Sequence, residues 1–284
     1  MHQNTAVQAK GSRVDAPIPH GENCPLLAVD VGNSNIVIGC FEGVKLLCKW
    51  RIHSHPARSE DEYYGILQAL LTECGYAQPQ AVVISSVVPQ QTVVWQKMFA
   101  QYWALEATII NALSPLGLRY KVADPSFIGS DLVTNAFAAI SQYQQSAIII
   151  DLGTASTVQM VTSEGSFEGT AIIAGIQPSL QALTSRAAQL ANIEITAPPA
   201  LIGTNTRDAM LSGVVNSHVF ALDNFVRQLR LQYFDKTPIV TILTGGWAAL
   251  MQPLMPFVDV VEPNLTLNGL ALAYHKLASG ALAE

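Results

Sequence analysis

Residues 26–38 have the sequence LLAVDVGNSNIVI, and residues 147–159 repeat the same design as AIIIDLGTASTVQ. In each copy, a short apolar run is followed by Asp, an apolar residue, Gly and three small or polar residues, and a second run then begins. Asp151 comes 121 residues after Asp30, so the repeated unit has the size of a domain. The repeat predicts two related domains, each built around a strand–turn–strand.

The chemistry of this unit favours phosphate binding. The runs Leu26–Val29 and Ala147–Ile150 are too short for helices and too apolar for a solvated sheet, so they fit buried strands. Gly32 and Gly153 permit φ > 0 and leave no side chain above the turn, whose backbone N–H groups can point at an anion. The aspartates can contact phosphate through Mg²⁺. Two facing copies would hold a nucleoside polyphosphate; the alternative is two ordinary hairpins with Asp-x-Gly turns.

Composition narrows the class of protein. The chain has 284 residues, of which 50% are hydrophobic and 13% charged. This length favours two domains over one, and the low charged fraction suggests extensive buried surface, including a subunit interface. The net charge of −6 and the lack of a basic run argue against a nucleic-acid partner. No apolar stretch reaches about 18 residues, so no membrane span is expected.

Cysteine and histidine usage predicts neither disulfides nor a metal centre. The four cysteines form no C-x-x-C pair, and Cys40 and Cys48 are expected to be small core residues. This usage is typical of a reducing, cytoplasmic protein. His53 and His55 form an H-x-H pair, but no acidic or cysteine partner stands at ligand spacing. Residues 1–23 are polar, lack the apolar segment of a secretory signal and are expected to form a disordered tail.

The rest of the chain alternates strand and helix patterns, which predicts mixed sheets flanked by helices. Strands are expected at 36–41, 45–52, 82–84, 107–110, 169–173, 239–244 and 258–261. Helices are expected at 61–74, 132–142, 178–190, 208–233 and 265–278, and one through Trp95. The helix at 208–233 is unusually long for a compact domain, and such a helix often contacts a second subunit.

Two further motifs each allow a structural and a functional interpretation. Asp131 comes directly before a predicted helix, where a carboxylate can cap the helix and favour its dipole. Alternatively, Asp131 faces the phosphate site and accepts a proton from an alcohol. The dipole would lower its basicity, but in phosphoryl transfer the base mainly orients the alcohol, so a weak base suffices. Gly245-Gly246 either lets the backbone approach a base or ribose or makes a tight strand–helix turn.

Taken together, these motifs resemble type III pantothenate kinase. The matching segments, in the order found in that family, are DVGNSN at 30–35, SSVVP at 85–89, GSD at 129–131, DLGTAST at 151–157, IGTNT at 202–206, TGG at 244–246 and NLTLNGL at 264–270. The Asp-Gly turns alone identify only the wider actin/sugar-kinase/Hsp70-like superfamily. The resemblance, over roughly residues 26–278, implies an α/β fold of two duplicated ribonuclease H-like domains, 24–140 and 141–284, with mixed β-sheets flanked by helices and an ATP cleft between them.

The resemblance also implies an activity and a site. The family transfers the γ-phosphoryl group of ATP to the primary alcohol of pantothenate, the first step of coenzyme A biosynthesis, as a homodimer that uses Mg²⁺ and a monovalent cation (K⁺ or NH₄⁺). By resemblance, Asp131 is the proton acceptor and Asp151 the monovalent-cation ligand. Expected ATP contacts are Asp30, Val31, Gly32, Asn33, Ser34, Asn35, Ile36, Val37, Thr154, Gly245 and Gly246. Expected pantothenate contacts are Tyr120, Gly129, Ser130, Asp131, Leu132 and, from the partner subunit, Thr206.

One departure from the family pattern keeps other functions open. The family motif is Gly-x-Asp-Arg, and its arginine, which contacts pantothenate, is replaced here by Leu132. A lost charged hydrogen bond costs about 1.5–3 kcal/mol, or ten- to a hundredfold in binding, unless Arg119, Lys121 or Arg186 compensates. The alternatives are therefore a kinase for another small alcohol, which suits an acceptor without a carboxylate, and a catalytically impaired regulatory homologue.

Overall fold

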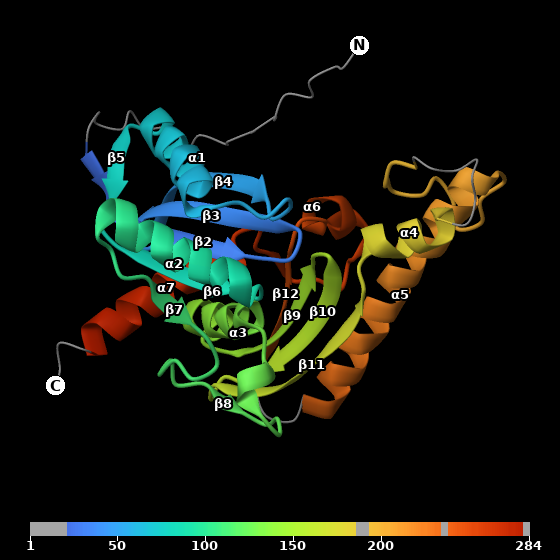
Figure 1. Ribbon diagram of the computed structural model, residues 1–284. Coiled ribbons are helices and arrows are strands. Elements are labelled where there is room, and N and C mark those ends of the chain that lie inside the picture. The colour runs from blue at the N-terminus through green and yellow to red at the C-terminus, as the bar shows by residue number, and fades with distance from the viewer. Residues whose placement is uncertain (1–21, 186–192, 234–237, 281–284) are drawn as a thin grey trace, which may run out of the picture. The chain divides into compact units, whose positions relative to one another are not determined.

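The computed structural model describes residues 22–185, 193–233 and 238–280 (Figure 1), so the expected tail lies outside the described residues except for its last two positions. Backbone contacts divide the chain into two compact units. Unit 1 comprises the residues up to Leu116, Ser126–Thr134 and the residues from Thr266 onward. Unit 2 comprises Gly117–Pro125 and Asn135–Leu265. The sequence predicts one boundary near residue 140, whereas the chain passes between the units several times.

Unit 1 is built on a five-stranded mixed sheet in the order β4-β3-β2-β6-β7. Its strands are β2 (Leu26–Val31), β3 (Asn35–Glu42), β4 (Lys45–His53), β6 (Val82–Ser86) and β7 (Thr108–Ile110). β2, β3 and β4 form an antiparallel meander, and β6 and β7 continue the sheet in parallel. A separate parallel pair, β1 (Glu22–Cys24) with β5 (Tyr76–Pro79), was not predicted from the sequence.

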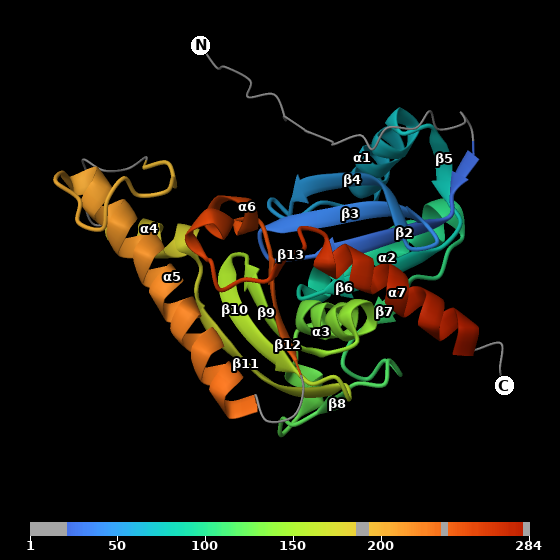
Figure 2. The same cartoon turned by 180° about the vertical axis from the view of Figure 1, so that it is seen from behind.

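Helices cover both faces of the unit 1 sheet. On one face, α1 (Glu60–Glu73) and α2 (Pro89–Trp103) pack their aromatic residues against alternate strand residues such as Val29 and Ile38. On the other face lies α7 (Leu265–Gly280) (Figure 2). Its Leu267 packs close to Gly39 of β3. α1 begins where it does because Ser59 and Glu62 form a capping box. The sheet is therefore buried on both sides.

Unit 2 repeats this architecture on a six-stranded sheet in the order β13-β12-β9-β10-β11-β8. Its strands are β8 (Arg119–Tyr120), β9 (Ser146–Leu152), β10 (Ala155–Val161), β11 (Ser166–Ala174), β12 (Ile239–Thr244) and β13 (Val260–Val261). β9, β10 and β11 form the antiparallel meander, and β12 and β13 continue it in parallel. Strand for strand, β13-β12-β9-β10-β11 corresponds to β7-β6-β2-β3-β4, which confirms the duplicated α/β design predicted from the two Asp-x-Gly motifs.

The helices of unit 2 also lie on both faces of its sheet. α4 (Ile176–Thr184) and α5 (Thr206–Tyr233) pack on the face that carries Ile150 and Val158. α3 (Ser130–Tyr143) reaches the opposite face, where Asn135 bonds to Asp151. The short helices are η1 (Pro125–Phe127), α6 (Ala248–Met251) and η2 (Gln252–Leu254). The long helix is confirmed at 28 residues, whereas the end of the predicted helix 178–190 lies outside the described residues.

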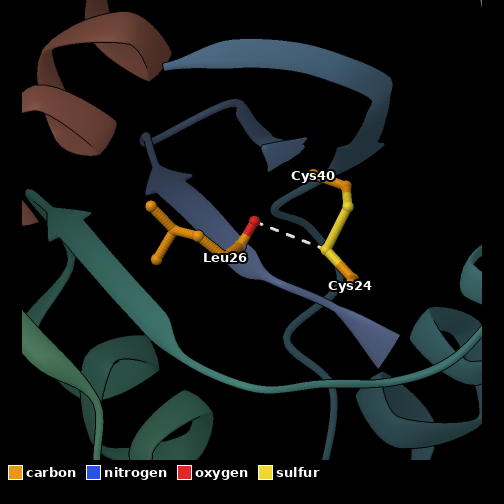
Figure 3. The surroundings of a disulfide bond; sticks show 3 residues. All are labelled: Cys24, Leu26 and Cys40. Atoms are coloured by element: carbon orange, nitrogen blue, oxygen red, sulfur yellow. Dashed lines mark hydrogen bonds between the residues drawn. A yellow bond between two sulfur atoms is a disulfide. The ribbon is translucent and has the colours of Figure 1, made fainter. Parts of the chain in front are cut away.

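A disulfide between Cys24 of β1 and Cys40 of β3 corrects the sequence-based interpretation (Figure 3). Both cysteines are fully buried, as predicted for Cys40, but they are bonded to one another. The pairing could not be predicted because β1 is held in place by tertiary contacts rather than by a sequence pattern. Cys48 and Cys74 are free.

None of the helices within the described ranges is both long and apolar enough to cross a membrane.

Candidate active site

The first Asp-x-Gly turn joins β2 to β3 in unit 1. Asp30 lies opposite Val37, and the Gly32 N–H donates to the Asn35 carbonyl oxygen at 3.0 Å, which closes the turn. The second turn, in unit 2, is one residue shorter, because Asp151 lies opposite Thr157, six residues later rather than seven. The two turns are therefore related in design but differ in length.

Ser54, which directly follows β4, holds the first turn in place. Its Oγ donates to the Gly32 carbonyl oxygen at 2.6 Å, and its N–H donates to the Ser34 carbonyl oxygen at 3.0 Å. The Ser54 carbonyl oxygen accepts from Gln91 Nε2 at 3.0 Å, and Gln91 Oε1 accepts from the Tyr63 hydroxyl at 3.0 Å. Ser54 is fully buried. A hydrogen-bond network thus connects the turn to both α1 and α2.

Sequence analysis missed Ser54 and considered its neighbours instead. His53 and His55 stand on either side of it as the H-x-H pair. Within the described ranges, no three His, Cys, Asp or Glu side chains gather in a way that could hold a metal ion. The residue that contacts the turn is Ser54. Its full burial distinguishes it from other serines, and no local sequence pattern reveals that burial.

Unit 1 brings two of the three predicted carboxylates to one edge of its sheet. Asp30 is the register neighbour of Ser85 in the parallel pair β2 and β6. The Ser85 hydroxyl donates to the Ser130 hydroxyl at 3.0 Å, and Ser130 begins α3 immediately before Asp131. The carboxyl ends of parallel strands meet at the same edge, which is where α/β proteins place their ligands. This chain of neighbours connects Asp30 with Asp131 within unit 1.

The environment of Asp131 differs from the sequence-based expectation. Part of the residue is reachable by solvent, but its carboxylate is largely buried, and this burial raises the pKa of Asp131 above its ordinary value. The Leu132 N–H donates to Oδ1 at 2.8 Å and opposes the rise in the pKa. Sequence analysis expected the helix terminus to lower the basicity; that expectation is wrong, because desolvation outweighs it. Asp131 is a stronger base than the sequence suggests.

Gly129 makes room for this carboxylate. A Cβ atom at position 129 would overlap Asp131 Oδ1 and would also contact Val87. The predicted Gly-Ser-Asp motif is therefore a packing unit, in which Ser130 bonds to Ser85 and Gly129 leaves space for Asp131.

In unit 2, Asp151 is held by neighbours on three elements. Its Oδ2 accepts from Asn135 Nδ2 at 3.2 Å. Thr244 of β12 lies beside it in register, and Gly245 follows with φ +95°. A Cβ at Gly245 would lie 2.5 Å from Asp151 Oδ1 and from the Leu152 nitrogen. The close strand–helix turn thus accounts for Gly245.

The other predicted residues of unit 2 are separated along its sheet and helix α5. Thr154 is exposed, and its carbonyl oxygen accepts from the Gly175 N–H at 3.2 Å. Thr206 is exposed at the start of α5, where Asn205 Oδ1 accepts from the Asp208 N–H at 2.9 Å. The Thr206 side chain is therefore not needed to cap this helix and is available for another contact.

Tyr120 lies in β8, and its ring packs against Phe167 with 5.9 Å between centroids. Its hydroxyl is buried without a hydrogen-bond partner, and burial raises the pKa of Tyr120 to about 12. The hydroxyl therefore stays protonated near neutral pH and can act as a hydrogen-bond donor.

Leu132 is buried, with 8% of its surface exposed, and no positive charge replaces the family arginine there. Two of the three cations considered as substitutes are already paired. Lys121 Nζ bonds to Glu168 at 2.8 Å, and Arg119 approaches Glu164 at 3.6 Å. Arg186 lies outside the described residues.

Solved structures with a similar fold define the class of protein. The activator of the 2-hydroxyisocaproyl-CoA dehydratase from Clostridium difficile, with bound ADPNP, matches with a TM-score of 0.54 at 12% identity, over 91% of this chain and 97% of that chain. Component A of the (R)-2-hydroxyglutaryl-CoA dehydratase from Acidaminococcus fermentans matches with a TM-score of 0.53 at 12% identity, over 89% and 98%. The chain therefore shares the α/β fold of these two proteins.

Sequence comparison identifies the family within this class. The family model for type III pantothenate kinase matches residues 26–228. The type III pantothenate kinase of Thermomicrobium roseum is 36% identical over 254 residues, which cover 89% of this chain and 97% of that protein. The enzyme of the same name from Brevibacillus brevis is 38% identical over 253 residues, which cover 88% and 98%. The chain belongs to the type III pantothenate kinase family.

Proposed function

We propose that the protein transfers the γ-phosphoryl group of ATP to the primary alcohol of pantothenate, which gives 4'-phosphopantothenate, the first step of coenzyme A biosynthesis. Membership of the family supports this activity. The observation that supports it is the link from Asp30, in register with Ser85, through the Ser85–Ser130 hydrogen bond to the neighbouring Asp131. In this proposal, the first turn binds phosphate and Asp131 is the base.

Asp131 is the proposed catalytic residue. Its carboxylate accepts the proton of the alcohol while the alcohol oxygen forms a bond to the γ-phosphorus and the bond to the β-phosphate oxygen breaks, releasing ADP. Because its pKa is raised by burial, Asp131 is better matched to this proton transfer than an exposed aspartate. Gly129 and Ser130 hold it in place, and Leu132 lies next to the acceptor in this proposal.

The two Asp-x-Gly turns are the proposed ATP contacts. Residues 30–37 in unit 1 and Thr154 with Gly245 and Gly246 in unit 2 would bind the nucleotide. Backbone N–H groups of turns of this kind favour phosphate oxygens.

The residues present fit Mg²⁺ bound together with ATP. Mg²⁺ takes one or two protein carboxylates, and phosphate oxygens and water complete its shell. Asp30 would supply such a carboxylate, so no cluster of three protein ligands is required. The ion would neutralise phosphate charge. We propose Asp151 as the ligand of the monovalent cation, because its oxygens are anchored by Asn135 beside the second turn.

A homodimer is the proposed assembly. α5 exposes Phe220 and Leu231, with 59% and 77% of their surfaces accessible, and large apolar side chains on a long helix favour association. Thr206 begins the same helix, and in the dimer it would contact the pantothenate bound to the partner.

We propose a cytoplasmic location for this soluble metabolic enzyme. Disulfides are rare in that compartment, so the Cys24–Cys40 bond gives a direct test. Thiols in intact cells are trapped by acid quench and alkylation, and the two cysteines are then analysed by mass spectrometry. We expect both cysteines to be reduced. The Cys24 thiol would then have an acceptor in the Leu26 carbonyl oxygen, 3.4 Å away (Figure 3). Full oxidation in the intact cell would contradict the cytoplasmic location.

A second candidate function follows from Leu132. With no cation at this position, and with Arg119 and Lys121 already paired, the site also suits a small alcohol without a carboxylate. A panel of alcohols, with ADP release coupled to an optical assay, tests both functions. Pantothenate should be the best acceptor. Turnover of another alcohol with a clearly higher kcat/KM would favour the second function, and ATP binding without any transfer would identify a regulatory homologue.

A further inference from the structure

The end of β6 is fixed directly beside the first Asp-x-Gly turn. Residues 85–89 have the sequence SSVVP, which ends β6 and begins α2. The backbone of Ser85 is held on both sides, because it pairs with Asp30 of β2 and with a residue of β7. The Val87 N–H continues the ladder past the strand and donates to the Val31 carbonyl oxygen at 3.1 Å. This strand end therefore has a set position relative to the turn.

The Ser85 side chain points to the same face of the sheet as Asp30. Val29 and Ile84 belong to the core under α1 and α2. Because successive residues of a strand face opposite sides, Asp30 and Ser85 both point away from those helices. Ser85 is fully buried, and a buried hydroxyl group needs a hydrogen-bond partner.

The partner of Ser85 is the first residue of α3. Ser85 Oγ donates to Ser130 Oγ at 3.0 Å, and the two residues are 45 positions apart in the sequence. Only 6% of the surface of Ser130 is exposed, and its carbonyl oxygen accepts from the Thr134 hydroxyl at 2.7 Å. All three residues lie in unit 1. The hydrogen bond therefore ties the start of α3 to the end of β6 within one unit.

Val87 makes a second contact between the same two segments. Its Cγ1 lies 3.5 Å from the position that a Cβ atom would take at Gly129. The Gly129 carbonyl oxygen accepts the Val133 N–H at 3.1 Å as α3 begins. Asp131 follows Ser130, and its carboxylate lies back against Gly129, where a Cβ atom would overlap Oδ1. The end of β6 thus contacts both residues that precede Asp131.

We propose that Ser85 is a positioning residue, whose hydrogen bond to Ser130 fixes the start of α3 and thereby the carboxylate of Asp131. The inference rests on the proposed function, in which Asp131 accepts the proton of the alcohol. The backbone of β6 is bonded to β2, which carries Asp30, and its Ser85 side chain is bonded to the residue before Asp131. One strand end therefore sets the position of the base relative to the first turn.

The substitution Ser85→Ala tests this role, because it removes the hydroxyl group and keeps the backbone pairing of β6. We expect kcat to fall about tenfold or more, since displacement of a catalytic group by about 1 Å can cost about 10²-fold. KM for ATP should stay within about twofold of the wild-type value, because the pairing of β6 with β2 is retained. Initial rates of ADP release with pantothenate as the acceptor measure both constants.

Thr92→Val is the matched control at the same strand end. The Thr92 hydroxyl donates to Ser86 Oγ at 2.7 Å and approaches the Val88 carbonyl oxygen at 3.1 Å. This substitution also removes a hydroxyl–hydroxyl hydrogen bond, but the bond leads to α2 instead of α3. The Tm should fall, and kcat should stay within about twofold of the wild-type value. A tenfold loss of kcat in Thr92→Val would show that activity follows general stability, and would overturn the inference.

Two further measurements separate a positioning role from a structural one. In a double-mutant cycle, Ser85→Ala combined with Ser130→Ala should have about the same kcat as the less active single variant, because both substitutions remove one interaction. Losses of kcat that simply multiply would overturn the inference. The pH profile of kcat/KM is the second measurement. Burial raises the pKa of Asp131, so a loosened start of α3 that admits water should move the acid limb to lower pH in Ser85→Ala.

Hydrogen–deuterium exchange of residues 129–134 tests the anchoring itself, without reference to activity. Exchange should be faster in Ser85→Ala than in the wild type, and unchanged in Thr92→Val. Absence of pantothenate turnover by the wild type would reject the proposed function, and faster exchange in Ser85→Ala would then still show that Ser85 fixes the start of α3. Normal turnover by the wild type, with unchanged kcat and unchanged exchange in Ser85→Ala, would overturn the inference alone.

Discussion

Asp131 combines a partly buried carboxylate with a backbone donor, and the balance between them determines its basicity. Replacing it with Asn keeps an oxygen that can accept from the Leu132 N–H but removes the base. We expect kcat to fall by about 10²- to 10⁴-fold, the usual contribution of a general base. Steady-state kinetics measure the loss, and an unchanged circular dichroism spectrum shows that the fold is retained. Retention of more than half the wild-type kcat would contradict the assignment.

The raised pKa of Asp131 also predicts how stability depends on pH. Since its pKa in the fold is raised above the ordinary value of 3.8, its contribution to stability is fully present below that value and is lost as pH rises through the folded pKa. Asn does not titrate. The Tm of Asp131→Asn relative to the wild type should therefore increase between pH 4 and pH 7, as measured by thermal melts. A relative Tm that decreases over this range would mean that the pKa is lowered.

Ser54 offers a test of the first turn that leaves the catalytic groups intact. Ser54→Ala removes the hydrogen bond to the Gly32 carbonyl oxygen and should cost about 1–3 kcal/mol of unfolding free energy. It should also raise KM for ATP more than KM for pantothenate. Chemical denaturation and initial-rate kinetics measure the two effects. His53→Ala, on the neighbouring residue, is the control and should change neither constant by more than about twofold.

At the scale of single residues, sequence motifs identified some residues of the candidate site and missed others. Asp30, Ser85 and Asp131 were marked by motifs, and the structure brings them to one edge. Ser54 and Gln91 were not found, because a polar residue looks the same in sequence whether it is exposed or fully buried. The direction of the pKa shift of Asp131 was also wrong, because the helix terminus is a local feature whereas desolvation depends on the tertiary fold.

At the scale of the secondary-structure elements, Gly245 and Gly65 are two glycines whose replacement by Ala should change stability in opposite directions. Gly245→Ala, between β12 and α6, combines φ +95° with a Cβ that would lie 2.5 Å from backbone and carboxylate atoms. It should destabilise the fold by more than about 1 kcal/mol. Gly65→Ala in α1, where a Cβ would meet nothing within 4 Å, should stabilise the fold by about 0.5–1 kcal/mol. Urea denaturation measures both, and the same sign for the two variants would refute this comparison.

The elements that sequence analysis found are those with strong local patterns. The strands of both meanders and α1 were predicted because apolar runs and helical spacing are visible in sequence, whereas the Ser59–Glu62 capping box was seen only in the structure. β1 and β8 were missed, since strands of three and two residues are defined by the partners they meet. The disulfide was missed for the same reason, because Cys24 lies in β1.

At the scale of the whole molecule, we predict a homodimer that associates through α5. Phe220→Asp places a charge in the exposed apolar part of α5 and should convert the protein to a monomer in analytical ultracentrifugation. Activity should fall as well, because Thr206 of the partner would no longer reach the bound pantothenate. Val93→Asp, at an exposed apolar residue of α2, is the control and should remain dimeric. A wild type that sediments as a monomer would exclude the proposed assembly.

The duplicated architecture was predictable at this scale, because the two Asp-x-Gly units are visible as a repeat and each became the centre of a sheet. That α7 belongs to unit 1 was not predictable from the sequence. Its residues come last in the sequence, yet from Thr266 onward they belong to unit 1, where Leu267 packs near Gly39 and His275 Nε2 lies 2.9 Å from the Gly43 carbonyl oxygen.

This return of the C-terminal helix has a consequence for synthesis on the ribosome. The first half of the chain emerges early, but one face of its sheet stays uncovered until α7 leaves the exit tunnel. Nascent chains halted before Thr266 should therefore expose apolar strand surface around Gly39 and recruit holdase chaperones. The strands made first are fully protected only after α7 has been synthesised.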